Sequence, residues 1–187
     1  MKNILLLVLT AFVFLGCTKK LETDVKPYVT LHQNEKQNVM INFLGVTDER
    51  TTKIVATILQ DDKVSIEYPL NVNAKLWYEE ALKRELINAD MLSNDKTSNI
   101  SVSVNIKNIS ATYKKYSLDT KNMKANVKIE LVIKKGDTTV SSQIEANQTM
   151  YKPMILDAEG FESIINESMR DSVSKTVSIL IKKIKEK

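Results

Sequence analysis

The chain has 187 residues, of which 43% are hydrophobic and 27% are charged, with 4 glycines and 3 prolines. This composition is typical of one globular domain and excludes a collagen-like, wholly disordered or membrane-embedded protein. The formal net charge is only +4, and guanidinium groups occur only at Arg50, Arg84 and Arg170. Because recognition of phosphates and bases favours arginine, this composition argues against a nucleic-acid partner.

The first residues have the pattern of an export signal. A short cationic start, Met1-Lys2-Asn3, precedes a twelve-residue apolar run from Ile4 to Leu15 that only Thr10 interrupts. A helix of this length rises roughly 18 Å, which is less than the ~30 Å hydrocarbon core of a bilayer. The pattern therefore predicts a signal peptide over residues 1–16 and not a membrane span.

The only cysteine follows this run directly. Leu15-Gly16-Cys17 resembles the lipobox of bacterial lipoproteins, with Phe14 as a departure three residues before the cysteine. The resemblance implies diacylglycerol on the Cys17 sulfur, cleavage before this residue, and a further acyl chain such as palmitate on the new amine. Thr18 in place of aspartate implies sorting to the outer membrane, with the domain facing the periplasm and surface exposure left open. The alternative is an ordinary secretory signal with a coincidental cysteine.

The residues after Cys17 are polar and lack hydrophobic periodicity, which is typical of a linker. A flexible stretch of about twenty residues has a root-mean-square reach of roughly 25 Å. We therefore expect a lipidated, flexible tether over residues 17–38, followed by a single folded domain over residues 39–187.

Three short strands are expected at the start of this domain. The first covers Val39–Val46. The second and third, Lys53–Gln60 and Lys63–Tyr68, flank Asp61-Asp62, which is typical of a hairpin turn. The spacing of apolar residues then predicts an amphipathic helix over Asn71–Leu92, with Asn71 or Asn73 as its N-cap.

The second half of the domain predicts an antiparallel meander and a long helix. Apolar residues alternate from Ile100 to Ile106, and their parity then shifts by one, which indicates a bulge near Lys107-Asn108. Two further alternating runs, Ala125–Ile133 and Val140–Ala146, continue the meander. The terminal helix is expected over Ala158–Lys185. The predicted fold is α+β, with two helices packed on one face of a bent antiparallel sheet.

This order of elements resembles the YajG-like lipoproteins, a family of small bacterial envelope proteins. The matching features are the lipobox, Tyr28-Val29-Thr30-Leu31 before the first strand, Asp48-Glu49-Arg50-Thr51 after it, Leu76-Trp77-Tyr78-Glu79-Glu80-Ala81-Leu82 in the first helix, the meander and the terminal helix. A looser likeness is to the lipoprotein that plugs the lipopolysaccharide translocon. The resemblance implies the same fold and an envelope location, without assigning a biochemical role.

The side chains that common catalytic and cofactor sites require are scarce. The glycines after the signal, Gly45, Gly136 and Gly160, are too far apart for a phosphate-binding loop. The only histidine, His32, lies in the predicted tether, so zinc sites and Cys/His catalysis lack their ligands. Adjacent carboxylates such as Asp61-Asp62 lie among residues typical of turns and surfaces, whereas a glycosidase needs two carboxylates across a cleft. We therefore expect no enzyme activity, no metal, no nucleotide and no cofactor other than the acyl chains.

A few other residues are candidates for a site. Asp48 and Arg50, alternate residues just past the first strand, are expected to form a loop-fixing ion pair, with a ligand site as the alternative. Trp77 and Tyr78 are expected to pack in the core, with a partner-facing surface as the alternative. Asn147 lies in a sequence that resembles a bacterial glycosylation sequon, and its place in a predicted strand argues against modification.

Together these features predict a membrane-anchored, non-catalytic binding or accessory module of the cell envelope, with an envelope protein or lipid as its partner. The alternative is an accessory subunit of a lipid or lipopolysaccharide transport machine, which requires an apolar groove between helix and sheet. A hydrolase of envelope polymers would need two carboxylates converging in a cleft.

Overall fold

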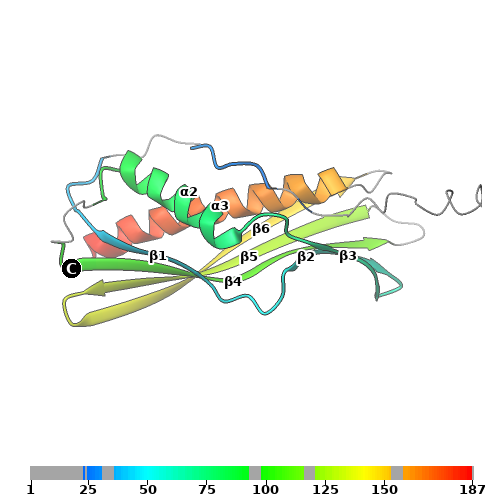
Figure 1. Ribbon diagram of the computed structural model, residues 1–187, viewed down its shortest axis with the longest axis horizontal. Helices are drawn as coiled ribbons and strands as arrows, with labels where there is room; N and C mark the ends of the chain where they lie inside the picture. The colour runs from blue at the N-terminus through cyan, green and yellow to red at the C-terminus, as the bar shows by residue number, and fades with distance from the viewer. Residues whose placement is uncertain are drawn as a thin grey trace, which may run out of the picture.

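The computed structural model describes Thr23 and residues 25–30, 36–92, 98–115, 121–152 and 158–186. The predicted signal peptide, Cys17 and Thr18 lie outside these residues. The elements are β1 (Asn42–Asp48), β2 (Ile54–Gln60), β3 (Lys63–Pro69), α2 (Ala74–Asn88), β4 (Ile100–Lys115), β5 (Lys121–Lys135), β6 (Thr138–Lys152) and α3 (Ala158–Lys185). Both helices lie on one side of a long twisted sheet (Figure 1), which confirms the predicted α+β class.

The sheet has the strand order β3-β2-β4-β5-β6, and β1 also pairs with β4. The β4–β5–β6 part is the antiparallel meander that the sequence predicts. By contrast, β1 and β2 both run parallel to β4, beside residues 101–106 and 111–115 respectively. The sheet is therefore mixed, because the link over residues 49–53 carries the chain onward along the same edge of β4 without reversing its direction.

The long strand β4 contains the predicted bulge. Its register with β5 shifts between Ile106 and Asn108, where the apolar parity changes in the sequence. The extra residue allows Ile106 and Ile109 both to face the helices, with 0% and 2% of their surface exposed. A bulge also bends the strand and increases its twist. The gap between β1 and β2 lies next to this bulge, where the Glu49 backbone N–H donates to the Ile106 carbonyl oxygen at 3.0 Å.

Two short signals in the sequence mark a turn and a helix start correctly. The β2–β3 hairpin turns at Asp61 and Asp62, which both have positive φ angles, 51° and 57°, as a tight hairpin turn requires. Helix α2 begins after Asn73, whose side-chain oxygen accepts a hydrogen bond from the Leu76 backbone N–H at 3.2 Å. Asn73 is therefore the N-cap, and Asn71 precedes the helix.

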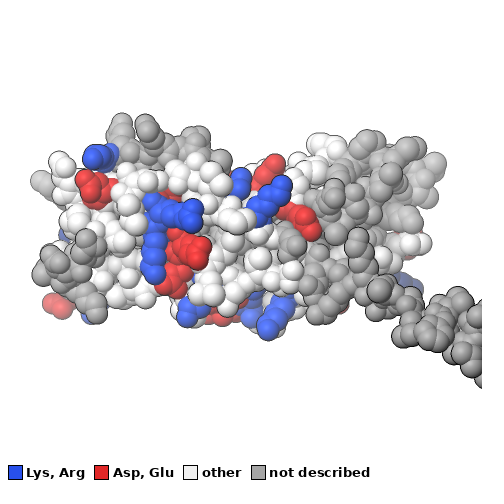
Figure 2. All heavy atoms as spheres, turned by 45° about the horizontal axis from the view of Figure 1, so that its top comes forward, with Lys and Arg blue, Asp and Glu red and all other residues white. Residues whose placement is uncertain are grey.

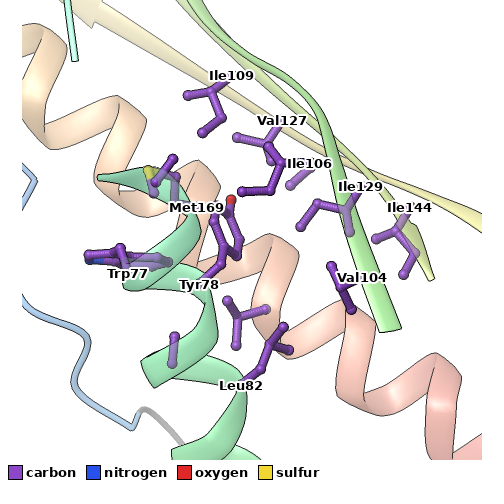
Figure 3. Close-up of a cluster of buried hydrophobic side chains, with 14 of the residues drawn as sticks. Trp77, Tyr78, Leu82, Val104, Ile106, Ile109, Val127, Ile129, Ile144 and Met169 are labelled. Carbon is purple, nitrogen blue, oxygen red and sulfur yellow. The ribbon is translucent and has the colours of Figure 1, made fainter. Parts of the chain in front are cut away.

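The hydrophobic core fills the space between the helices and the sheet (Figure 3). On α3, the exposed fraction is at most 2% for each of Ile165, Met169, Val173 and Val177. The residues that the sheet contributes around them include Val104, Ile106, Ile109, Val127, Ile129 and Ile144. The apolar stripe of α3 and the alternating residues of the strands thus meet in one layer, as their periodicities predict.

Part of the predicted tether belongs to the folded domain. Val25 and Tyr28 are only 7% and 5% exposed. The Tyr28 hydroxyl donates to Glu85 Oε1 of α2 at 2.6 Å, and Trp77 Nε1 donates to the Lys26 carbonyl oxygen at 2.9 Å. Residues 25–30 are therefore held against α2 and are not a flexible lead. Composition did not predict this, because the few apolar residues of this polar stretch form no helical or strand periodicity.

Candidate functional site

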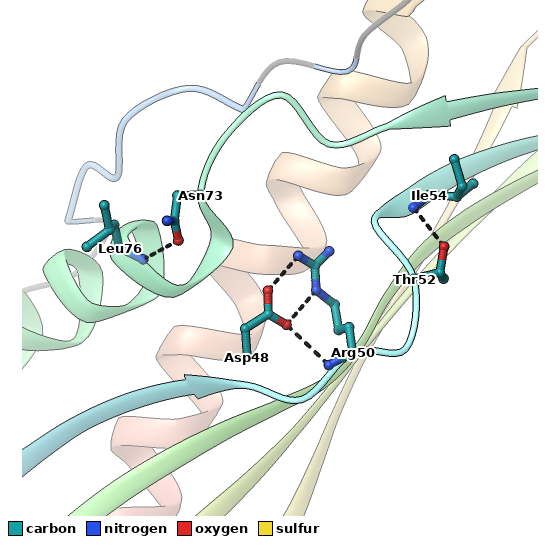
Figure 4. A network of polar contacts seen from close by, with 6 residues as sticks. All are labelled: Asp48, Arg50, Thr52, Ile54, Asn73 and Leu76. Atoms are coloured by element: carbon teal, nitrogen blue, oxygen red, sulfur yellow. Dashed lines mark hydrogen bonds and ion pairs between the residues drawn. The ribbon is translucent and has the colours of Figure 1, made fainter.

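Asp48 and Arg50 come together where β1 ends and the link to β2 begins (Figure 4). Arg50 Nε and Nη2 donate to Asp48 Oδ1 and Oδ2 at 2.8 and 2.7 Å. The Arg50 side chain is only 8% exposed and the Asp48 side chain 28%. The hydrogen bonds from Arg50 lower the pKa of the Asp48 carboxyl. The two charged groups thus bind each other and connect the end of β1 to the start of the link that leads to β2.

The Arg50 side chain extends under the start of α2. Its Nη1 is buried and has no hydrogen-bond acceptor among the described residues. Asn73, the N-cap of α2, lies on the same side of the link in Figure 4, and its oxygen is already bound to the Leu76 N–H. A buried guanidinium with one unsatisfied nitrogen depends on its carboxylate partner, so this pair is a structural element of the junction between β1, β2 and α2.

Trp77 and Tyr78 lie in the core, with 7% and 0% of their surface exposed. The Ser172 hydroxyl donates to the Met169 carbonyl oxygen at 2.6 Å, so it accepts the hydrogen bond from Tyr78 Oη at 2.9 Å. Burial raises the pKa of Tyr78 and keeps this donor neutral. The partner-facing alternative for these two rings does not hold, because α3 covers one and residues 25–30 cover the other.

The sheet face that points away from the helices carries a network of polar side chains. Glu130 of β5 accepts hydrogen bonds from Lys107 Nζ at 2.8 Å, Asn105 Nδ2 at 3.1 Å and Ser141 Oγ at 2.9 Å. These hydrogen bonds, that of Lys107 first, lower the pKa of Glu130 to about 2. The network joins three neighbouring strands at the bulge.

We expect this network to make stability depend on pH. The folded-state pKa of Glu130 lies below its ordinary value of 4.5, so its contribution is complete above that value and is lost as the pH falls toward 2. Glu130→Gln should therefore flatten the decrease in unfolding free energy between pH 6 and pH 3, measured by urea denaturation. Gln143→Ala, on the neighbouring strand, is the uncharged control and should keep the wild-type slope. An unchanged slope in Glu130→Gln would contradict this prediction.

Beyond the bulge, the same open face is hollowed. The ends of β4, β5 and β6 form a concavity of about 670 Å³, here called the polar hollow. Its lining includes Ser110, Thr112, Lys124, Asn126, Asn147 and Thr149. These residues alternate with buried ones such as Ala111 and Ala125, so their side chains point away from the helices. Asn147, the residue of the sequon-like sequence, is thus an exposed residue of this surface.

Sequence reasoning missed the polar hollow. The pattern of alternating polar residues on β4, β5 and β6 predicts a solvated sheet face, but it does not show which polar residues lie opposite one another across strands. The available signal was compositional: between Ser110 and Thr149 the outward positions are mostly Asn, Ser, Thr and Lys, and acidic residues are rare among them. Register alone brings these residues together.

The helix-bearing side shows no comparable concentration of one residue type. Figure 2 shows basic and acidic side chains interspersed on this side, and several form ion pairs, such as Lys83 with Glu79 at 2.7 Å and Lys175 with Asp171 at 2.7 Å. Among the described residues, no helix is apolar and long enough to cross a bilayer. In the same ranges, no group of three or more His, Cys, Asp or Glu residues is arranged to hold a metal ion.

The fold is a mixed sheet covered on one face by two helices, and the family match places the chain in the class of envelope lipoproteins. The chain belongs to the family described as uncharacterized lipoprotein, whose model matches residues 27–178. This is the YajG-like family that the sequence motifs resemble. The match begins within the segment that packs against α2. No curated protein sequence matches the chain.

Comparison with solved structures gives several matches. Protein XCC0632 from Xanthomonas campestris has a TM-score of 0.51 at 11% identity, over 83% of this chain and 91% of that chain. Rare lipoprotein B from Shewanella oneidensis is less similar, with a TM-score of 0.45 at 10% identity over 68% of this chain and 94% of that chain. A minor lipoprotein from Acinetobacter baumannii has a TM-score of 0.42 at 14% identity over 68% and 93%. At these identities the likeness to XCC0632 shows the fold alone.

Proposed function

We propose that this lipoprotein is a non-catalytic module, anchored through Cys17 to the outer membrane, whose periplasmic domain binds another envelope component. The observation that carries the proposal is the open face of the sheet. Strands β4, β5 and β6 are 15 or 16 residues long, roughly three times the usual strand length. Because both helices lie on the other face, this length leaves a broad surface of hydrogen-bonding side chains for a partner.

The acidic groups on the described part of this face support a binding role over catalysis. Glu49 and Glu130 both contact Lys107, and Glu145 pairs with Lys128 at 2.9 Å. Each of these three carboxylates is held by a lysine, whereas hydrolysis of a glycan needs two carboxylates that converge on one bond.

A role as an accessory subunit for lipid or lipopolysaccharide transport is less well supported. It requires an apolar groove between the helices and the sheet. In the described residues this space is filled by side chains such as Phe161, Ile164 and Leu131, each with 0% exposure. The concavity lies on the opposite face and is lined by polar side chains. These observations favour a polar partner for the folded domain.

Site-specific photocrosslinking of the lipidated protein in its native cells tests this proposal. A photoreactive amino acid at Gln143, exposed on the open face, is expected to give a discrete adduct with an envelope component. The same group at Glu80, exposed on α2, is the matched control and should give none. Adducts of equal yield at both positions, or an adduct only at Glu80, would contradict the proposal, as would their absence at Gln143.

A further inference from the structure

The strand register arranges the polar hollow as rows of side chains across three strands. Ser110 of β4 lies opposite Asn126 of β5, which lies opposite Asn147 of β6. In the next row, Thr112 lies opposite Lys124, and Lys124 lies opposite Thr149. Neighbouring strands are about 4.8 Å apart, so hydroxyl, amide and ammonium groups repeat at this spacing. This repeat is close to the length of a single pyranose ring.

Three asparagines form a chain of hydrogen bonds that runs from Asn108, one row away on β4, to Asn126 and Asn147. Asn108 Nδ2 donates to Asn126 Oδ1 at 2.9 Å, and Asn126 Nδ2 donates to Asn147 Oδ1 at 2.7 Å. The chain fixes the orientation of each amide, so the exposed Asn147 presents its own NH2 group outward. A pre-oriented amide beside threonine hydroxyls suits a ligand with many hydroxyl groups, because each hydroxyl both donates and accepts.

A third row adds an unsatisfied acceptor and an exposed aromatic ring. Asn122 lies opposite Tyr151 across β5 and β6. The Asn122 Oδ1 atom is buried in the lining and has no hydrogen-bond donor among the described residues. The Tyr151 side chain is 71% exposed, the largest exposure among the described large hydrophobic residues. Tyr151 lies outside the lining itself, and its ring, with an apolar face and a polar hydroxyl, provides a stacking surface beside the hollow for the C–H face of a sugar.

The charge of the hollow is positive. Lys124 stands at its centre and is exposed, and it forms no ion pair with a residue that the structure describes. Lys114, also in the lining, is paired with Asp62 of the β2–β3 turn at 2.9 Å. Since the hollow has a central ammonium and no carboxylate among the described residues of its lining, it favours a ligand with an anionic substituent.

We propose that the polar hollow binds a saccharide that carries an acidic group. The sugar hydroxyls bond to the Asn and Thr side chains, one pyranose ring stacks on Tyr151, and the carboxylate or phosphate lies against Lys124. This inference rests on the proposed binding function and names the chemistry of the ligand. Acidic sugars of this kind occur in cell-wall glycans and in phosphorylated lipid headgroups, which share the same recognition chemistry.

The test is a ligand-observed NMR titration of the full-length lipidated protein in detergent micelles. The probes are the N-acetylglucosaminyl-N-acetylmuramic acid disaccharide, a phosphorylated glucosamine disaccharide, and neutral diacetylchitobiose. We expect one or both acidic probes to bind more tightly than the neutral probe. Tighter binding of the muramic acid disaccharide would indicate a cell-wall glycan as the ligand, and tighter binding of the phosphorylated disaccharide would indicate a lipid headgroup. Tyr151→Ala should weaken this binding about tenfold. Lys124→Gln should reduce the preference for the acidic probe about threefold.

Lys83→Gln, the same change of charge on α2, is the control and should bind as the wild type does. Lys124 and Tyr151 are exposed, so both variants are expected to keep the fold, which circular dichroism checks. No binding of any probe, equal affinity for the neutral probe, or binding that both variants leave unchanged would overturn the inference. If saccharide binding fails while the Gln143 photoadduct persists, the proposed binding function stands and its partner is of another class.

Discussion

Cys17→Ala is expected to release the protein from the membrane. Two or three acyl chains on the cysteine would supply the whole attachment, since each buried methylene contributes ~0.8 kcal/mol. The variant lacks the thiol to which diacylglycerol is joined, so the chain that is cut from residues 1–16 should carry no acyl group. Intact-mass measurement and fractionation of washed membranes from the native host check this result. The wild type should show the mass of a chain that begins at a lipidated Cys17.

Thr18→Ala is the control for this change, because it alters the neighbouring residue and keeps the cysteine. It should retain the lipid mass and remain with the membrane. A wild-type protein that carries an unmodified thiol, or that is washed from membranes as easily as Cys17→Ala, would contradict the prediction. It would favour the ordinary secretory signal with a coincidental cysteine.

Asp48→Ala is expected to lower the free energy of unfolding by about 3 kcal/mol, because it leaves a buried positive charge without its partner. The Arg50 side chain is only 8% exposed, and its Nη1 already lacks an acceptor among the described residues. Loss of the carboxylate removes the two short hydrogen bonds to Nε and Nη2. Urea denaturation of the purified protein at neutral pH measures the change.

The double variant Asp48→Ala/Arg50→Met separates the ion pair from simple loss of packing. Methionine keeps much of the apolar stem and removes the charge, so the double variant should be more stable than Asp48→Ala alone. Glu145→Ala breaks the exposed pair with Lys128 within regular strands and is expected to change stability by only about 0.5 kcal/mol. Equal losses in Asp48→Ala and Glu145→Ala would contradict the larger contribution expected of the buried pair.

Local patterns in the sequence were sufficient for most individual elements. The change of apolar parity after Ile106 placed the bulge of β4, and Asp61-Asp62 placed the tight turn of the β2–β3 hairpin. Helix α3 has the predicted bounds, Ala158–Lys185. These features depend on residues close together in the chain, since periodicity and turn chemistry are set by neighbours.

The candidate site shows the opposite dependence. The spacing of Asp48 and Arg50 predicted an ion pair, but the burial of the guanidinium results from the packing of α2 above it. The sequence did not predict the polar hollow, because it arises from the register of three strands.

The sequence by itself predicts an export signal and offers a single candidate for lipidation, and it determined the apolar face of each helix and strand, and therefore the α+β class. Only the tertiary structure decided that β1 and β2 run parallel to β4, that residues 25–30 close over Trp77, and that the polar residues of β4, β5 and β6 form one surface. The reason is physical: side-chain periodicity specifies which face is buried, whereas strand direction, register and covering segments depend on contacts between residues far apart in the chain.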